Sequence, residues 1–281
     1  MNWFDLWWIF PAAIAFSTIA IGSGVSGALF FSPFFMLVVG LTPVQAVGAG
    51  LLTEVFGMGN GLRAYVTAKL VDYATARWLL SGAVPGVIVG AVVADAIPSQ
   101  VLKGIFGVGL LILAGFLILV RSPEECEPGD RAMPLIDRKS EGKGTTVIRA
   151  KDGSVYEYPT CWRPPGVAMA AVGGVLTGMV SAGLPEISTT QLVVRCRVPP
   201  RVAIATSVFT LAVVAALGAA VHALHAEPVW QVVAWSIPGV LVGSTLGSKL
   251  GKYLPAKVME KILGVVFALV GLLVLALEFW K

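Results

Sequence analysis

Charged residues are scarce in this 281-residue chain. Asp, Glu, Lys and Arg make up 13% of the sequence and hydrophobic residues 57%, whereas soluble domains carry about 25% charge. Such a chain has too little polar surface to face water on all sides, so we expect an all-α polytopic membrane protein packed closely in lipid. The net charge of +4 comes from basic residues in short loops. Such loops are typical of the cytoplasmic side of a membrane, so nucleic acid is not an expected partner.

Cysteine, histidine and catalytic motifs are also few. The three cysteines, Cys126, Cys161 and Cys196, have no metal-ligand spacing and indicate no disulfide framework. We interpret them as incidental thiols near the cytoplasmic face. The two histidines, His222 and His225, are expected in a solvated outer loop and predict no metal site. Nucleophile-elbow, zinc-protease and P-loop motifs are missing, so the sequence predicts neither an enzyme nor a cofactor.

The apolar stretches form two similar series. The first two stretches of each series are too short to cross comfortably, because a helix needs about 20 residues to span the hydrocarbon core. We therefore divide the chain into a first transmembrane repeat (1–121), a cytoplasmic linker (122–163) and a second transmembrane repeat (164–281). The approximate stretches are 7–21, 27–41, 44–66, 73–96 and 101–120, then 166–180, 185–194, 202–224, 229–249 and 258–279.

The two halves also match in sequence. Residues 85–91 (PGVIVGA) correspond to residues 238–244 (PGVLVGS), which indicates an internal duplication. If the short pair in each half forms a re-entrant hairpin, nearly all basic loop residues fall on one face, as the positive-inside rule expects. Each half then adds three crossings, an odd number. We therefore predict inverted repeats in the cell membrane, with both termini outside and the linker in the cytoplasm.

Two Gly/Ser-rich interruptions, 22–27 (GSGVSG) and 178–186 (GMVSAGLPE), break the short pairs. Matched helix breaks in two halves indicate a transporter site at the bilayer midplane, where irregular backbone must face protein or a watery cavity. Half-helix N-termini present N–H donors and partial positive charge, which favours an anion; close packing through small residues is the alternative. The candidate substrate-binding residues are Ser23, Gly24, Ser26, Gly27, Gln45, Ser181, Gly183, Ser188, Thr189, Thr206 and Ser207.

Two carboxylates lie in apolar surroundings. Glu54 lies deep in an apolar helix, and Glu186 begins the second half of the second break. A carboxylate inside a membrane is costly and tends to be functional, so both are candidate proton carriers. Glu186 has an equally good alternative as a helix-end charge stabilised by the helix dipole.

The linker changes character along its length. Residues 122–144 are rich in charged residues, Pro and Gly, and we expect a flexible tether. Residues 145–158 place Asp152-Gly153 between alternating β-formers, which predicts a β-hairpin. A two-stranded hairpin is marginal alone, so we expect it to rest on the cytoplasmic loops, as a gate or as decoration.

The breaks and the residues after them resemble a duplicated family signature. The first break is followed by Pro33 and by residues 43–46 (PVQA), and the second by residues 199–207 (PPRVAIATS). This pattern is similar to that of the TauE/SafE sulfite-exporter family, over nearly the whole chain outside 121–163. The family's Ala-x-x-Thr-Ser pattern matches residues 203–207, whereas the first repeat has Gly48-Ala49-Gly50 at the equivalent point.

This resemblance implies a secondary transporter of small sulfur oxyanions or organosulfonates, such as sulfite, thiosulfate or sulfoacetate. We expect a proton- or gradient-coupled exporter that works by alternating access around the two hairpin tips. Its partners would be the small anion and the lipid bilayer, with a homo-oligomer left open. The alternatives are an anion channel or uptake permease with the same site, and a membrane scaffold that recruits a partner through its cytoplasmic hairpin.

Overall fold

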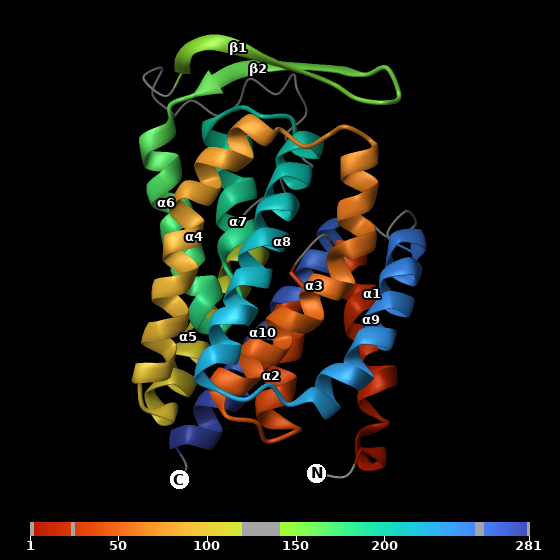
Figure 1. Ribbon diagram of the computed structural model, residues 1–281, viewed down its shortest axis with the longest axis vertical. Helices are drawn as coiled ribbons and strands as arrows, with labels where there is room; N and C mark the ends of the chain where they lie inside the picture. Colours follow the sequence, from red (N-terminus) through yellow and green to blue (C-terminus); the bar gives the residue numbers. More distant parts are fainter. Residues whose placement is uncertain (1–2, 24–25, 120–140, 251–255, 280–281) are drawn as a thin grey trace.

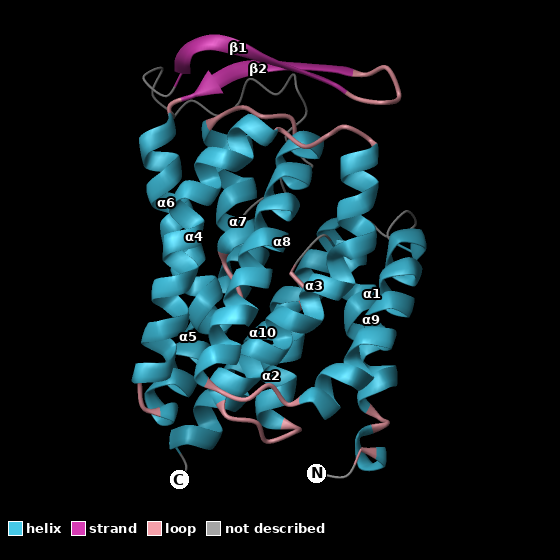
Figure 2. Ribbon diagram, viewed as in Figure 1, coloured by secondary structure: helices cyan, strands magenta, loops and turns pink. Residues whose placement is uncertain are grey.

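The computed structural model describes residues 3–23, 26–119, 141–250 and 256–279, and these are mostly helical (Figure 2). Two of the helices, α4 and α8, are long and apolar enough to cross a membrane. In chain order the elements are η1 (Phe4–Leu6), α1 (Ile9–Ser23), α2 (Ala28–Leu37), α3 (Pro43–Thr67), α4 (Tyr73–Ala96), α5 (Ser99–Leu119), β1 (Glu141–Arg149), β2 (Val155–Cys161), α6 (Arg163–Val180), α7 (Leu184–Thr190), the π-helix η4 (Gln191–Arg195), α8 (Pro200–His225), α9 (Trp230–Leu250) and α10 (Ala256–Phe279).

The helices form one elongated bundle with two different ends (Figure 1). The β1–β2 hairpin covers one end, which we call the hairpin end. Helix α1 begins, and α10 ends, at the opposite end, which we call the terminal end. The long helices α3, α4 and α8 run between the two ends.

Each sequence break separates two short helices. Helix α1 runs from the terminal end into the bundle and α2 returns toward that end, whereas α6 enters from the hairpin end and α7 with η4 returns toward it (Figure 1). Local sequence explains the second break: Ser181 adopts a left-handed conformation with φ 56°, and Gly183 follows with φ 111°. Left-handed backbone at the end of a helix stops its propagation, and the next helix begins at Leu184 with Pro185 in its first turn.

Helix pairs from the two halves pack through glycine. Helix α4 packs mainly on α6, and α9 packs mainly on α1. A Cβ atom added at Gly90 would lie 2.2 Å from the Val175 carbonyl oxygen of α6, and one added at Gly243 would lie 2.5 Å from the Ile14 carbonyl oxygen of α1. The two matched PGVxVG segments therefore make equivalent contacts. Small residues allow such backbone approach between helices in lipid.

We expect Gly90→Ala to lower the free energy of unfolding by about 3 kcal/mol, since α4 and α6 must separate to admit the methyl group. Thermal unfolding in detergent measures this loss. Gly104→Ala is the matched control, because nothing lies within 4 Å of a Cβ atom added at that position. A Gly90→Ala protein as stable as the Gly104→Ala protein would contradict the close approach.

The predicted β-hairpin is confirmed, and it rests on the connections between helices. Strands β1 and β2 pair in antiparallel register, and Gly153 in the turn has φ 87°. The Lys151 backbone N–H donates to the Ala68 carbonyl at 3.0 Å. The Tyr158 hydroxyl donates to the buried Asp72 carboxylate, also at 3.0 Å. Burial and the neighbouring Asp72 charge raise the pKa of Tyr158 well above its usual value, so the hydroxyl stays a donor.

A disulfide fixes the base of this hairpin. Cys161 at the end of β2 bonds to Cys196 just after η4. The interpretation of these two residues as incidental thiols is therefore wrong, because the fold brings together cysteines that are 35 residues apart in sequence. Cys126 lies outside the described residues.

We expect Tyr158→Phe to loosen the hairpin, because Asp72 loses a buried donor. The loss of one such bond costs about 1–2 kcal/mol, so trypsin should cut after Arg149 and Lys151 about tenfold faster. Limited proteolysis measures this rate, with Val155→Ala at an exposed strand position as the control. Equal cleavage rates in both variants would show that the hydroxyl does not hold the hairpin.

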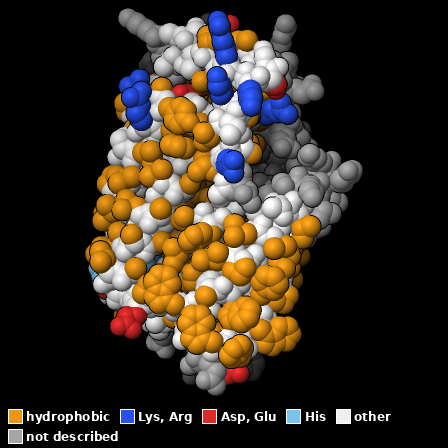
Figure 3. Space-filling model, turned by 45° about the vertical axis from the view of Figure 1, so that its right-hand side comes forward, with side chains coloured by type: hydrophobic (Ala, Val, Ile, Leu, Met, Phe, Trp, Pro, Cys, Tyr) orange, Lys and Arg blue, Asp and Glu red, His pale blue; other side chains and the backbone are white. Residues whose placement is uncertain are grey.

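Basic residues gather near the hairpin end. Figure 3 shows Lys and Arg side chains there, with apolar side chains over much of the rest of that face. Arg63 and Arg77 flank the connection from α3 to α4. Arg197 lies in the connection from η4 to α8, and Arg201 lies in the first turn of α8. Both connections lie at the hairpin end (Figure 1). Lys103 is the fifth residue of α5, which begins at the other end.

Candidate functional site

Helix α2, which follows the first break, meets the second break inside the bundle through two serines. The hydroxyl oxygens of Ser32 on α2 and Ser181 after α6 are 2.5 Å apart, and neither side chain is exposed. The Ser181 hydroxyl also donates to the Val180 carbonyl at 2.7 Å. Because a hydroxyl has one proton, Ser32 is the donor of the bond between the two serines. This bond joins the first half of the chain to the second at the level of both breaks.

Glu54 on α3 faces the first break. Its Oε1 accepts the Ser26 hydroxyl at 2.5 Å, and the backbone N–H groups of Gly27 and Ala28 also face the carboxylate. The side chain is 2% exposed, and its Oε2 has no hydrogen-bond partner among the described residues. The carboxylate of Glu54 therefore lies against the start of α2, where helix N–H groups carry partial positive charge.

Glu186 on α7 belongs to the same cluster. Its Oε2 accepts the Gly183 backbone N–H at 3.1 Å, and the Ser26 backbone N–H also faces it. It lies close enough to Glu54 for the two carboxylates to repel each other. Glu186 thus has a contact that suits each interpretation: it caps α7, and it faces the other candidate proton carrier.

Several buried hydroxyls near the breaks or on neighbouring helices have no hydrogen-bond partner within the described part of the chain. These are Ser188 on α7, Thr53 on α3 and Ser207 on α8, each 1% exposed or less. Buried polar groups are nearly always hydrogen-bonded, so an unsatisfied hydroxyl inside the bundle is a candidate contact for water or a ligand. Three such groups on three helices are consistent with a polar interior.

The structure brings together only some of the predicted site residues. Ser26, Gly27, Glu54, Ser181, Gly183 and Glu186 lie at or beside the meeting point of the breaks. Ser188 and Thr189 lie further along α7, and Ser207 on α8. Ser23 ends α1, and Gly24 lies outside the described residues.

Two predicted residues have local roles away from this cluster. Gln45 completes a capping box with Thr42 at the start of α3, at the terminal end. The Thr206 hydroxyl accepts the Asp72 backbone N–H at 3.0 Å, and Asp72 also holds Tyr158 of the hairpin. Thr206 therefore connects α8 to the α3–α4 connection.

Sequence reasoning missed Ser32. It is the one hydroxyl in the otherwise apolar helix α2 (ALFFSPFFML), which is the signal that could have identified it. Gly50 on α3 leaves room for the Ser32 side chain, because a Cβ atom added at Gly50 would lie 2.2 Å from the Ser32 Oγ.

One histidine also lies elsewhere than predicted. His222 is 2% exposed inside α8, and its Nε2 lies 2.8 Å from the Gly178 carbonyl, which can only accept, so Nε2 carries the proton. The expectation of a solvated loop is wrong for His222, since α8 continues to His225 before Pro228 prevents further helix. His225 is exposed. No group of three or more His, Cys, Asp or Glu residues in the described chain could hold a metal ion.

Comparisons with known proteins show which family the chain resembles. The family profile described as "Sulfite exporter TauE/SafE" matches residues 9–274. A relative named "Probable membrane transporter protein YunE" from Bacillus subtilis is 26% identical over 258 residues, which cover 91% of this chain and 90% of that protein.

A second relative is longer. It is named "Probable membrane transporter protein MamO", from Magnetospirillum gryphiswaldense, and is 25% identical over 235 residues, covering 79% of this chain and 37% of that protein. No solved structure matches the chain significantly. Since the profile spans both helix breaks and nearly every described helix, the chain belongs to the sulfite exporter TauE/SafE family of membrane transporters.

Proposed function

We propose that this protein is a secondary transporter that exports a small sulfur oxyanion or organosulfonate. The observation that carries the proposal is the meeting of the two halves near their helix breaks, where Ser32 contacts Ser181 and the Ser26 backbone N–H faces Glu186. The carboxylates of Glu54 and Glu186 lie close to each other there. Broken helices that meet inside a membrane protein provide backbone donors and carboxylates where a substrate and a coupling ion can both bind. The family description supports a sulfur anion as the cargo.

The helix pairing supports an organisation as inverted repeats. The first helix of each half packs on the fourth helix of the other half, as α1 on α9 and α6 on α4. Helices at equivalent positions also pair, as α3 with α8 and α5 with α10. Alternating access would then be a rocking of these bodies around the breaks. The gathering of basic residues supports a cytoplasmic hairpin end.

The position of Glu54 supports a specific form of coupling. The Ser26 hydroxyl and the first N–H groups of α2 suit an oxyanion, and Glu54 already uses them. A substrate anion near two ionised carboxylates would be repelled strongly in surroundings of low dielectric constant. Proton uptake by Glu54 would remove this competitor and release the donors. Anion and proton would therefore bind together and move in the same direction.

Flux into inside-out proteoliposomes tests the proposal. Labelled sulfite, thiosulfate and sulfoacetate are offered with and without an outside-acid pH gradient, and liposomes without protein give the background. We expect saturable uptake of at least one anion, accelerated by the gradient. No flux of any of these anions would contradict the proposal. Flux that follows the membrane potential alone would favour a channel or an uncoupled permease.

Two variants distinguish the transporter from the scaffold alternative. If the hairpin only recruits a partner, Ser181→Ala should leave function intact and deletion of residues 122–163 should abolish it. The proposed transport site predicts that Ser181→Ala impairs flux, because Ser32 loses its acceptor.

A further inference from the structure

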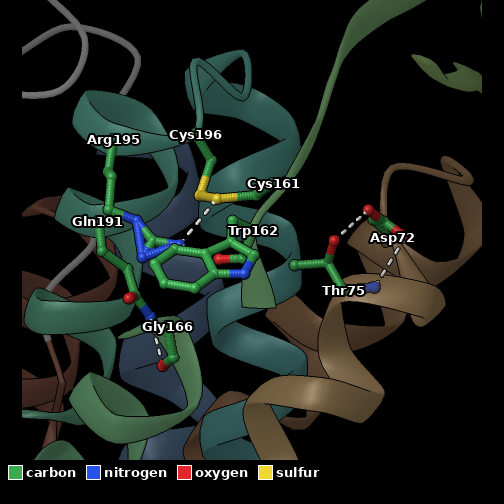
Figure 4. The surroundings of a disulfide bond; sticks show 8 residues. All are labelled: Asp72, Thr75, Cys161, Trp162, Gly166, Gln191, Arg195 and Cys196. Atoms are coloured by element: carbon green, nitrogen blue, oxygen red, sulfur yellow. Dashed lines mark hydrogen bonds between the residues drawn. A yellow bond between two sulfur atoms is a disulfide. The ribbon is translucent and has the colours of Figure 1, made fainter. Parts of the chain in front are cut away.

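A second polar cluster lies at the hairpin end, away from the helix breaks. Arg195, the last residue of η4, donates from Nη2 to the Cys161 Sγ at 3.0 Å and to the Trp162 carbonyl (Figure 4). Its Nε and Nη1 are buried and have no hydrogen-bond partner among the described residues. The Arg195 guanidinium therefore places positive charge directly beside a disulfide sulfur, which favours the approach of an anion to that sulfur.

The disulfide can be approached from a small pocket. Cys161 lines a cavity between the hairpin and the first turns of α4 and α6, together with Thr75, Trp78 and Arg163. Asp72 also lines it, but Thr75, Tyr158 and the backbone N–H groups after Asp72 engage its carboxylate. Cys196 is 2% exposed, whereas Cys161 is partly exposed. An incoming group therefore reaches the Cys161 sulfur first.

We infer that this cluster is a site of reversible reaction with sulfite, at which Cys161 forms an S-sulfonate and the adjacent Arg195 guanidinium offsets the charge of the anion. The inference rests on the proposed function for the identity of the anion. Sulfite is a sulfur nucleophile, and a disulfide is opened by attack on one of its sulfur atoms. No other chemical partner is required.

The reaction balances without an added oxidant or reductant. The sulfite lone pair forms a new sulfur–sulfur bond to the Cys161 Sγ, and the bond to Cys196 breaks. Its electron pair leaves on Cys196 as a thiolate, and Cys161 carries the SO₃⁻ group. When sulfite is depleted, the Cys196 thiolate attacks the Cys161 sulfur, releases sulfite and restores the disulfide. The Arg195 guanidinium offsets the negative charge of the sulfite and of the S-sulfonate, both when the S-sulfonate forms and when the disulfide is restored.

The position of the Cys161–Cys196 disulfide gives its reaction with sulfite a consequence for transport. Cys161 lies two residues before α6, the first leg of the second break, and Cys196 follows η4, the end of its return leg. The disulfide therefore ties together the outer ends of the two legs. Sulfite would loosen this end when it accumulates, so the cargo would raise its own rate of export.

Mass spectrometry of the purified protein tests the chemistry without any transport assay. In a Cys126→Ser background, the folded protein is incubated with sodium sulfite and its free thiols are then alkylated. We expect the mass of one SO₃ group on the Cys161 peptide and alkylation of Cys196. Failure to react while folded, with reaction after denaturation, would overturn the inference, as would an adduct on Cys196.

Neighbouring arginines provide the matched control. We expect Arg195→Gln to slow sulfonation about tenfold, the effect of losing a charge-assisted contact, and Arg195→Lys to restore part of the rate. Arg197→Gln removes the same charge from an exposed position two residues away and should react at the unaltered rate. Equal rates for Arg195→Gln and Arg197→Gln would overturn the role of Arg195, and thermal unfolding verifies that each variant is folded.

Flux measurements separate this inference from the proposed function. Preincubation with sulfite should raise the initial flux of the unaltered protein, whereas the Cys161→Ser/Cys196→Ser protein should start at the raised rate and not respond. Sulfonation without flux of any sulfur anion would contradict only the transport proposal. Flux that is identical in both proteins and insensitive to preincubation would overturn the regulatory consequence.

Discussion

Glu54→Gln is expected to remove the pH dependence of anion binding and to abolish accumulation driven by a pH gradient. A neutral amide at this position does not compete as an anion for the Ser26 hydroxyl and the first N–H groups of α2. Charge-assisted contacts of this kind are worth about 1.5–3 kcal/mol. Binding of the substrate anion at pH 8 should therefore become at least about tenfold tighter, while the unaltered protein binds better as the pH falls. Calorimetric titration and proteoliposome flux measure the two effects.

Glu227→Gln is the control for this variant, because it removes the same charge from the segment between α8 and α9. It should bind and transport like the unaltered protein. If Glu54→Gln keeps the pH dependence, Glu54 is not the proton carrier. Glu186→Gln then becomes the deciding variant, since Glu186 is the carboxylate that faces Glu54.

Gly50→Ala is expected to lower anion flux by roughly tenfold to a hundredfold while the protein remains folded. The added methyl group would lie 2.2 Å from the Ser32 Oγ and 3.3 Å from the Ser32 backbone nitrogen. Ser32 must move, and its hydrogen bond to Ser181 in the second break is lost. A displacement of about 1 Å in a preorganised site is enough for a loss of this size.

The same helix supplies the controls for this second prediction. Nothing lies within 4 Å of a Cβ atom added at Gly59 or Gly61, so alanine at either position should leave flux unchanged. Ser32→Ala removes the hydroxyl without adding volume and should reproduce much of the Gly50→Ala defect. If Ser32→Ala transports normally, the bond between the serines is structural and the substrate path lies elsewhere.

The helix breaks and the β-hairpin could be predicted because their signals are local. Glycine and serine interrupt apolar runs at 22–27 and 178–186, and Asp152-Gly153 lies between alternating strand residues. The described helices separate at the first two positions, and the strands turn at the third. The carboxylates of Glu54 and Glu186 could also be identified, because a charge within an apolar run is visible in the sequence alone.

Contacts between distant segments could not be predicted in the same way. The partners Ser32 and Ser181, Tyr158 and Asp72, and Cys161 and Cys196 lie on segments whose proximity depends on how the bundle folds. His222 shows the related difficulty with helix ends, because one further helical turn changes a loop residue into a buried one. Physical pattern rules place helix ends only within a few residues.

The packing of α1 on α9 and of α6 on α4 interlocks the two halves of the chain. Each half contributes its first helix to the other half, and the approach at Gly90 and Gly243 leaves no room for a substitute side chain. Neither half is therefore a folding unit on its own. Cut within the linker and produced as two polypeptides, the halves should assemble only when made together, and either one made alone should be degraded.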